Sequence, residues 1–328
     1  MADTRTFAET LGFKPSTSSA PTDFETLYNP EHMGNAANIA YGGFALAMAA
    51  KGACLTVPKG YHLYSMLGHY LGPALTDRPL KCSVRTIRQT RTFATRQVEV
   101  KQMQDSGEDR TCLIALADFQ VREPALLVYS KPPSMKYTSW RELDRQSVQL
   151  HKAVESGKVS QKIIAIHKKL FAAFPRMYEV RPCPEGIFAQ NISGMAKTNV
   201  TTQDSLPLDQ KSNAEWYSAY APFDSEADQM ACLSWLMDGA LSFSPLSFSH
   251  MFLDDASAVS SLDFALRLFS NDVDMTKWHL KEIQTHTGAE GRTYTEGRLY
   301  EEDGRCIASI TQQSICRPKK DNKVAYKL

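Results

Sequence analysis

Three polar residues in the second half of the sequence have side chains suited to activating a water molecule. Asp238 lies within the otherwise apolar run 227–243, Ser261 within the strand-like segment 258–268, and Gln312 within 305–316. A carboxylate can accept a proton from water as a general base, while a hydroxyl and an amide can hold that water by hydrogen bonds. The spacing places no histidine beside Ser261, so we expect this serine to orient water and not to act as a nucleophile.

Each of these residues also has a plainer structural interpretation, which the sequence leaves open. Asp238 is followed by Gly239, and Asp-Gly commonly marks a turn that ends a helix. Ser261 can be a solvated strand residue and Gln312 an exposed amide at the end of a strand. A buried carboxylate or amide is costly without hydrogen-bond partners, so the functional interpretation predicts that Asp238 and Gln312 are partnered.

The elements that must position these residues are one helix and a set of strands. The run 227–243 is rich in helix formers, and we expect Asp238 in its middle. In the segment 258–268, alternation puts Leu262 and Phe264 on the face that packs on the helix and Ser261 on the opposite face. Further strands are predicted at 214–220, 277–287, 292–300 and 305–316.

The first half of the sequence repeats this order of elements. Gly42 and Gly43 lead into an apolar helix, and strands are predicted at 62–71, 80–88, 93–103 and 111–121. Residues 140–172 are helical in pattern and highly charged, so 124–176 is interpreted as a connector. These segments predict an N-terminal unit over 1–123, the connector over 124–176, a C-terminal unit over 177–318 and a tail over 319–328.

A constant offset of 194 residues relates parts of the two halves, because Cys112 and Pro124 correspond to Cys306 and Pro318. At this offset Phe44, Leu67 and Asp118 occupy the places of Asp238, Ser261 and Gln312. We therefore expect one active site per chain, with a degenerate site in the first unit. The fold class expected from the duplication is α+β, with two units that each wrap an antiparallel sheet around a long central helix.

These segments resemble the acyl-CoA thioesterase II family, whose members fold as double hot-dogs. The matching segments are Tyr41-Gly42-Gly43, Tyr64-Ser65, His69-Tyr70-Leu71-Gly72-Pro73, Arg88, 91–98, Leu236-Met237-Asp238, Ser260-Ser261-Leu262-Asp263 and 307–312. The resemblance implies that Asp238, Ser261 and Gln312 are catalytic. The sequence departs from the family at Phe44, where the family has Gln, and at Ser261, where it usually has Thr. We expect Gly42, Gly43, Phe44 and His69 to contact the substrate.

The function expected from the resemblance is hydrolysis of an acyl thioester, carried by CoA or by a carrier protein, with no cofactor and no metal. Three alternatives stay open: a hot-dog dehydratase or hydratase, release of a carrier-bound polyketide chain, and a non-catalytic acyl-binding scaffold. No tight Asp and His run of the dehydratase kind occurs, and no nucleophile elbow, P-loop or zinc motif occurs either.

Composition limits the partners and the compartment. The formal net charge of +1 argues against a nucleic-acid or polybasic membrane surface, and the seven cysteines form no metal or disulfide pattern. The first residues carry acids and no apolar core, so we expect no signal peptide and a cytoplasmic protein. Tyr326-Lys327-Leu328 matches a peroxisomal tripeptide only in its last two positions, which keeps peroxisomal import possible. The family resemblance implies a possible homodimer.

Overall fold

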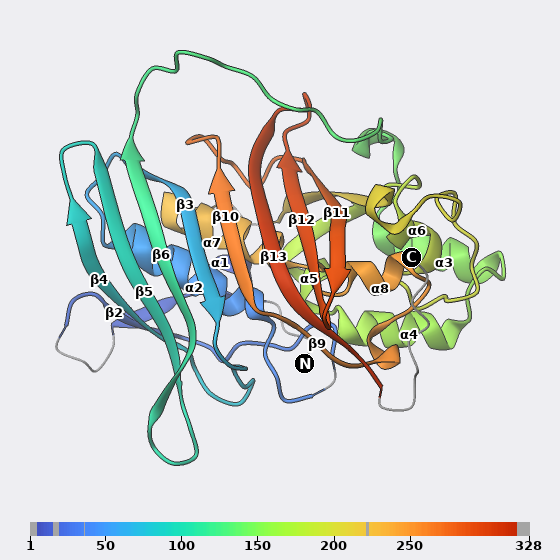
Figure 1. The fold of residues 1–328 in the computed structure, drawn as a ribbon, viewed down its shortest axis with the longest axis horizontal. Coiled ribbons are helices and arrows are strands. Elements are labelled where there is room, and N and C mark those ends of the chain that lie inside the picture. Colours follow the sequence, from blue (N-terminus) through green and yellow to red (C-terminus); the bar gives the residue numbers. More distant parts are fainter. Residues whose placement is uncertain (1–4, 16–19, 36, 221–222, 320–328) are drawn as a thin grey trace.

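The computed structural model describes residues 5–15, 20–35, 37–220 and 223–319, and one large antiparallel sheet runs through them (Figure 1). The sheet has 13 strands in the order β1-β2-β4-β5-β6-β3-β10-β13-β12-β11-β8-β7, and β9 also pairs with β13. The strands are β1 (Phe13–Pro15), β2 (Asp23–Thr26), β3 (Tyr61–Tyr70), β4 (Lys81–Gln89), β5 (Phe93–Met103), β6 (Asp109–Val121), β7 (Tyr178–Pro182), β8 (Ser212–Ala219), β9 (Ala256–Ser261), β10 (Asp263–Leu268), β11 (His279–Ala289), β12 (Arg292–Tyr300) and β13 (Cys306–Pro318).

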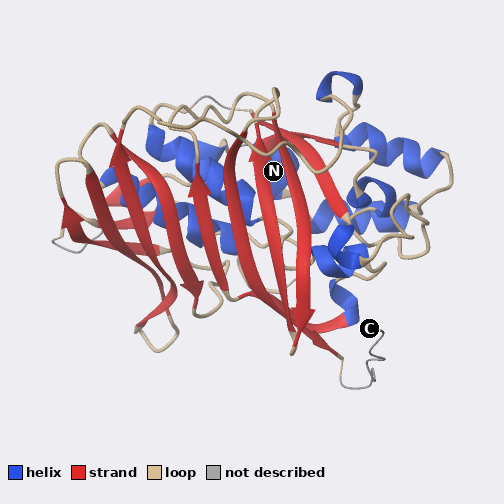
Figure 2. Ribbon diagram, turned by 45° about the horizontal axis from the view of Figure 1, so that its top comes forward, coloured by secondary structure: helices blue, strands red, loops and turns tan. Residues whose placement is uncertain are grey.

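Two long helices, α2 (Gly42–Leu55) and α7 (Glu226–Asp238), lie side by side against one face of this sheet (Figures 1 and 2). Both are buried almost all round, because each contacts the sheet and the other helix. They run antiparallel: the first turn of α2 lies beside Asp238, and Lys51 near the end of α2 pairs with Asp228 at 2.8 Å. The C-terminal end of α7 therefore meets the N-terminal end of α2.

The seam between the halves is a pair of antiparallel strands. β3 pairs with β10 in a continuous register from Ser65 opposite Arg267 to His69 opposite Asp263. This pairing removes the free strand edge that each half would otherwise expose. The predicted α+β architecture, with two helix-and-sheet units in one chain, is confirmed.

The connector region carries short helices that pack at one side of the second unit. Residues 124–139 cross the molecule without helix or strand, and helices follow from 146 onward (Figure 1). The remaining helices are α1 (Phe7–Thr10), α3 (Gln146–Glu155), α4 (Gln161–Leu170), α5 (Ala173–Met177), α6 (Ile187–Asn191) and α8 (Ser244–Phe248), with 3₁₀ turns at Trp140–Glu142, Leu208–Gln210 and Leu253–Asp255. Leu150 of α3 and Ile164 of α4 share a small apolar cluster with Ile192.

Two sequence predictions about local structure are wrong. The helix predicted over 227–243 ends at Asp238, because the chain leaves helical geometry at Gly239, where ψ is 133°. The single strand predicted over 258–268 is broken at Leu262 into β9 and β10. Both changes alter the surroundings of the candidate catalytic residues.

The constant offset of 194 does not hold through the structure. Starting from Gly42 it would begin the second helix at residue 236, whereas α7 begins at Glu226. The chain runs from α2 to β3 through residues 56–60 but from α7 to β9 through 239–255, which include α8. Phe44 is thus on the first turn of its helix and is no counterpart of Asp238, the last residue of α7. Asp118 likewise points away from the helices, where it accepts a hydrogen bond from Thr95 at 2.6 Å.

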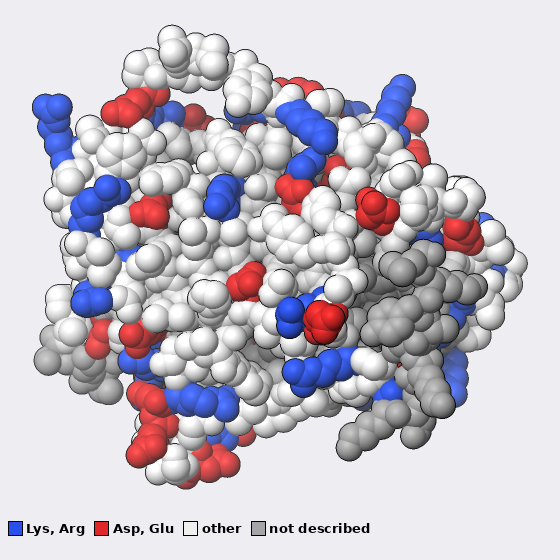
Figure 3. All heavy atoms as spheres, viewed as in Figure 1, with Lys and Arg blue, Asp and Glu red and all other residues white. Residues whose placement is uncertain are grey.

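The surface shows no segregation of charge over the outer face of the sheet. Lysine, arginine, aspartate and glutamate side chains are intermixed with uncharged residues on the face drawn in Figure 3. Within the described ranges, no helix has the length and apolar character needed to cross a bilayer, and no group of three or more His, Cys, Asp or Glu residues is placed to hold a metal ion. The tripeptide Tyr326-Lys327-Leu328 lies outside the described residues.

Candidate active site

Asp238, Gln312 and Ser261 form a continuous chain of hydrogen bonds. Gln312 donates from Nε2 to Oδ1 of Asp238, and its Oε1 accepts a hydrogen bond from Oγ of Ser261 at 3.0 Å. Asp238 and Gln312 are buried, with 5% and 0% of their surface exposed. The structure therefore brings together the three residues expected from the sequence, and each buried polar group has a partner.

The break at Leu262 explains how Ser261 reaches this chain. Ala265 of β10 pairs with Thr311 of β13, whereas Ser261 of β9 pairs with Ser314, so the register slips by one residue between the two strands. A one-residue slip turns every following side chain to the other face of a sheet. Ser261 consequently lies on the helix side with Gln312, and the expectation that it faces away from the helix is wrong.

The first half of the chain completes the surroundings of Asp238. Tyr70, the last residue of β3, donates from its hydroxyl to Oδ1 of Asp238 at 2.8 Å. Gly42 lies so near that a Cβ atom added to it would be 3.3 Å from Oδ2 of Asp238 and 3.1 Å from the Tyr70 ring. The site is therefore built from both halves, where the start of α2 meets the end of α7.

Burial and nearby groups shift the pKa of Asp238 in opposite directions. Burial raises the pKa of its carboxyl group, while hydrogen bonds from Tyr70 and Gln312 and the charge of Lys281 oppose that rise. Lys281 is itself buried, which lowers its pKa to about 7 against the opposing effect of the Asp238 and Glu215 charges. Its ammonium group donates to the carbonyl oxygens of Leu236 at 2.6 Å and Gly239 at 2.7 Å, so it also caps the end of α7.

A cavity of about 610 Å³ opens onto Asp238. Its walls come from the segments 33–45, 70–74 and 238–243 and from 257–262 of β9 and the break. Ser261 and Asp238 both line it, and apolar side chains such as Phe44, Phe171 and Phe243 cover much of the remaining wall. A mostly apolar cavity with a few converging polar groups is typical of a small-molecule site.

The four expected substrate-contacting residues separate in the structure. Gly42 and Phe44 line the cavity, whereas Gly43 packs against the ring of Tyr41, where an added Cβ would come within 2.2 Å. His69 does not line the cavity. It is exposed and points to the outer face of the sheet, because it alternates with the inward-facing Gly68 and Tyr70.

Two residues of the site were missed from the sequence. Tyr70 follows directly after His69, and the inward positions Met66 and Gly68 would have indicated the tyrosine by period-two alternation. Lys281 lies in the buried part of β11, between Leu280 and Glu282, and a buried lysine signals a specific partner.

Comparisons with known proteins agree over most of the chain. A family model described as the acyl-CoA thioesterase N-terminal domain matches residues 29–120, and one described as the acyl-CoA thioesterase C-terminal domain matches 174–316. The curated protein acyl-CoA thioesterase 2 of Haemophilus influenzae is 24% identical over 280 residues, covering 84% of this chain and 87% of that protein.

Solved structures with the same fold are more distant in sequence. The acyl-CoA thioesterase II TesB2 of Mycobacterium marinum has a TM-score of 0.66 and 17% identity, with 96% of this chain and 100% of that chain covered. A hot-dog protein of Alicyclobacillus acidocaldarius has a TM-score of 0.65 and 14% identity, covering 95% of this chain and 98% of that one. The likeness supports the double hot-dog fold.

Proposed function

Because the chain belongs to the acyl-CoA thioesterase family, we propose that it hydrolyses acyl-CoA thioesters with a water molecule activated at Asp238. The observation that carries this proposal is the hydrogen-bonded chain from Ser261 through Gln312 to Asp238 at the wall of the cavity. Hydrogen bonds stabilise the charged form of a buried carboxylate, so Asp238 can remain deprotonated and accept a proton from water.

Asp238 acts as the general base in this proposal. It accepts a proton from water, which attacks the thioester carbonyl and releases the free acid and the thiol. Gln312 and Ser261 hold the water and the carboxylate in place through their amide and hydroxyl groups. No histidine lines the cavity among the described residues, which argues against a serine nucleophile and against a dehydratase that pairs Asp with His.

The N-terminal end of α2 supplies a positive potential that can stabilise negative charge on the thioester oxygen. Its N-cap Tyr41 makes no side-chain capping bond, and the first amides of a helix have no carbonyl partner within the helix. Gly42 lies beside Asp238 and lets a ligand approach the backbone closely. We assign the amides at Gly42 and Gly43 to the developing negative charge on the thioester oxygen.

We further propose that each chain has one active site. The inward residues of β6 include Ala115, Ala117 and Phe119, and none offers an amide comparable with Gln312. We therefore propose that the unit over 1–123 acts as the wall of a single site, that the unit over 177–318 supplies the base, and that 124–176 connects them. Exposed Leu67 and Leu116 on the outer sheet face are consistent with a homodimer, which remains a prediction.

The experiment is a panel of acyl-CoA substrates of different chain lengths with a free-thiol readout. Wild-type protein should release thiol, and Asp238→Asn should lower the rate at least about 100-fold, the scale of general-base loss. Asp209→Asn, an exposed residue outside the cavity, is the matched control. Binding without thiol release would indicate a scaffold, and gain or loss of a conjugated double bond would indicate a hydratase or dehydratase. Activity on carrier-bound substrates alone would indicate release of a carrier-bound chain.

A further inference from the structure

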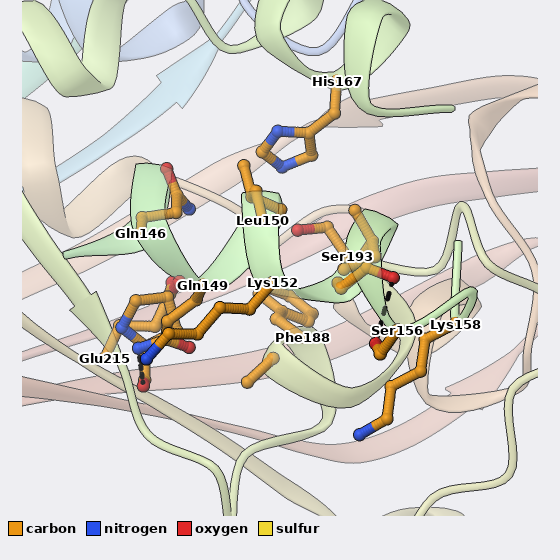
Figure 4. A pocket seen from close by; sticks show the side chains of 14 residues that line it. Gln146, Gln149, Leu150, Lys152, Ser156, Lys158, His167, Phe188, Ser193 and Glu215 are labelled. Carbon is orange, nitrogen blue, oxygen red and sulfur yellow. Dashed lines mark hydrogen bonds between the residues drawn. The ribbon is translucent and has the colours of Figure 1, made fainter. Parts of the chain in front are cut away.

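A second cavity of about 410 Å³ lies beside the active site, on the side covered by the connector helices. Figure 4 shows its wall, with side chains from α3, α4, α6 and β8. Its polar side chains include Gln146, His167 and Glu215, and its apolar side chains include Leu150 and Phe188. We call this cavity the polar chamber.

A small cavity of about 40 Å³ lies between the polar chamber and the catalytic cavity, and we call it the passage. Its wall includes Gln146, His167 and Glu215, which also line the chamber. At its other end it is lined by Phe171, Ala240 and Phe243, which also line the catalytic cavity. Ala240 is only two residues beyond Asp238, so the passage begins next to the proposed site of thioester cleavage.

Aromatic rings line the passage. The ring centroids of Phe188 and Phe243 are 5.7 Å apart with nearly parallel planes, and those of Phe171 and Phe243 are 6.0 Å apart. This wall suits a hydrocarbon segment, because it offers apolar contact without hydrogen bonds. An acyl chain that leaves the thioester through this passage would reach the polar chamber with its far end.

His167 is the clearest sign that the chamber receives a polar group. Only 4% of its surface is exposed, and its Nδ1 has no hydrogen-bond partner among the described residues. Its ring points from α4 into the space between Gln146, Leu150 and Ser193 (Figure 4). Burial lowers its pKa to about 4, so the imidazole is neutral near pH 7 and offers one donor and one acceptor.

Charged side chains of both signs line the chamber. Glu215 is 8% exposed, and its Oε2 accepts a hydrogen bond from the Tyr217 hydroxyl at 2.6 Å. Burial raises the pKa of Glu215, and the charge of Lys281 opposes that rise. The chamber wall carries Glu215 together with Lys152 and Lys158, so a ligand of either charge would meet a like charge, which favours a neutral polar group.

We propose that the polar chamber binds a hydroxyl group at the far end of the acyl chain, so that the enzyme prefers hydroxylated acyl thioesters to plain fatty acyl thioesters. A hydroxyl fits because it donates one hydrogen bond and accepts others. It can donate to Glu215 or His167 and accept from the Gln146 amide. This inference rests on the proposed function, since it needs the thioester at Asp238.

The connector supplies part of the chamber wall, and the rest comes from the C-terminal unit. Gln146 and His167 lie between the two segments that match the family models, 29–120 and 174–316. The catalytic residues lie inside those segments. Substrate preference in this region can therefore differ from that of relatives while the hydrolytic chemistry is retained.

The test measures binding of non-hydrolysable CoA thioethers whose alkyl chains either end in a hydroxyl group or do not, over a series of lengths. At the length that reaches the chamber, the hydroxylated ligand should bind roughly three- to tenfold more tightly, the effect of one buried hydrogen bond. His167→Phe should remove this preference and leave the affinity for the plain chain nearly unchanged. His151→Phe, on the exposed side of α3, is the matched control.

Equal binding of both ligands at every length, or a preference that survives in His167→Phe, would overturn the inference. If His167→Phe does not fold, Gln146→Leu, at a half-buried position, serves the same purpose. The outcome separates from that of the proposed function, because thioether binding requires no cleavage. Loss of thiol release with a retained hydroxyl preference would refute hydrolysis alone, and active hydrolysis without the preference would refute the chamber's role alone.

Discussion

The two ends of the antiparallel helix pair carry different chemistry although the same elements meet at both. At one end the start of α2 meets Asp238, and Tyr70 and Gln312 donate hydrogen bonds to that carboxylate. At the other end the start of α7 meets the end of α2, where Asp228 forms an ion pair with Lys51. The first end opens onto the catalytic cavity, which Asp238 and Ser261 line, whereas the start of α7 borders a separate cavity lined by Glu226 and Gln229.

A buried cation holds the helix terminus at both ends. Lys281 donates to the carbonyl oxygens of Leu236 and Gly239 at the end of α7. Arg96 donates to the carbonyl oxygen of Thr56 at 3.0 Å at the end of α2. The helix-capping role is therefore shared, and the site differs by the carboxylate at the last position of α7 and the glutamine on the facing strand. We propose that the scaffold, which is repeated twice, is catalytic at the end where these two side chains are present.

After the loss of Asp238 itself, the largest expected effect is the loss of Gln312. Gln312→Leu removes the donor to Asp238 and the acceptor for Ser261, so we expect the rate of thiol release to fall about 100-fold. Gln313→Leu is the matched control, because residue 313 faces the other side of the sheet. Equal activity of the two variants in the free-thiol assay would remove Gln312 from the site.

A smaller loss is expected at Ser261. Ser261→Ala deletes one hydrogen bond to Gln312, which corresponds to roughly a three- to tenfold fall in kcat/KM. Ser261→Thr retains the hydroxyl and should remain close to wild type, and Ser205→Ala, at an exposed position outside the cavity, should change nothing. A full loss of activity in Ser261→Ala would instead point to a serine nucleophile.

The smallest expected effect is a shift in pH dependence caused by Lys281. The base works when Asp238 is deprotonated, so activity is present above the Asp238 pKa and lost as the pH falls through it. Burial already raises this pKa, and the Lys281 charge opposes the rise. Lys281→Met should therefore move the acid limb of the pH–rate profile to higher pH, whereas the exposed Lys277→Met should not. A limb that stays in place or moves to lower pH would contradict the assigned coupling.

The sequence predicted the repeated elements well because each carries a local pattern. The strand predicted over 93–103 coincides with β5 and that over 292–300 with β12, since period-two alternation with turn residues at the ends marks both. The three candidate residues came from family resemblance, and the structure brings them into one hydrogen-bonded chain.

The remaining features depend on tertiary contacts that no local pattern carries. The predicted orientation of Ser261 was wrong because the break at Leu262 shifts the register of the strand by one residue. Only the pairing of β9 and β10 with β13 reveals this shift. The offset of 194 misassigned Phe44, since the chain after α7 is longer than the chain after α2. The role of Tyr70 depends on the seam between β3 and β10, which brings the first half to the carboxylate of the second.

The most direct test of the account compares the carboxylates at the two ends of the helix pair. Asp238→Asn and Asp228→Asn would be measured in the same free-thiol assay, with thermal unfolding followed for both. We predict at least about a 100-fold loss of kcat in Asp238→Asn with the fold retained. Asp228→Asn should cost up to about 3–5 kcal/mol of stability, because the ion pair is largely buried, and keep wild-type kcat at temperatures below its unfolding. Wild-type turnover in Asp238→Asn, or an equal loss in both variants, would contradict a single site at the end of α7.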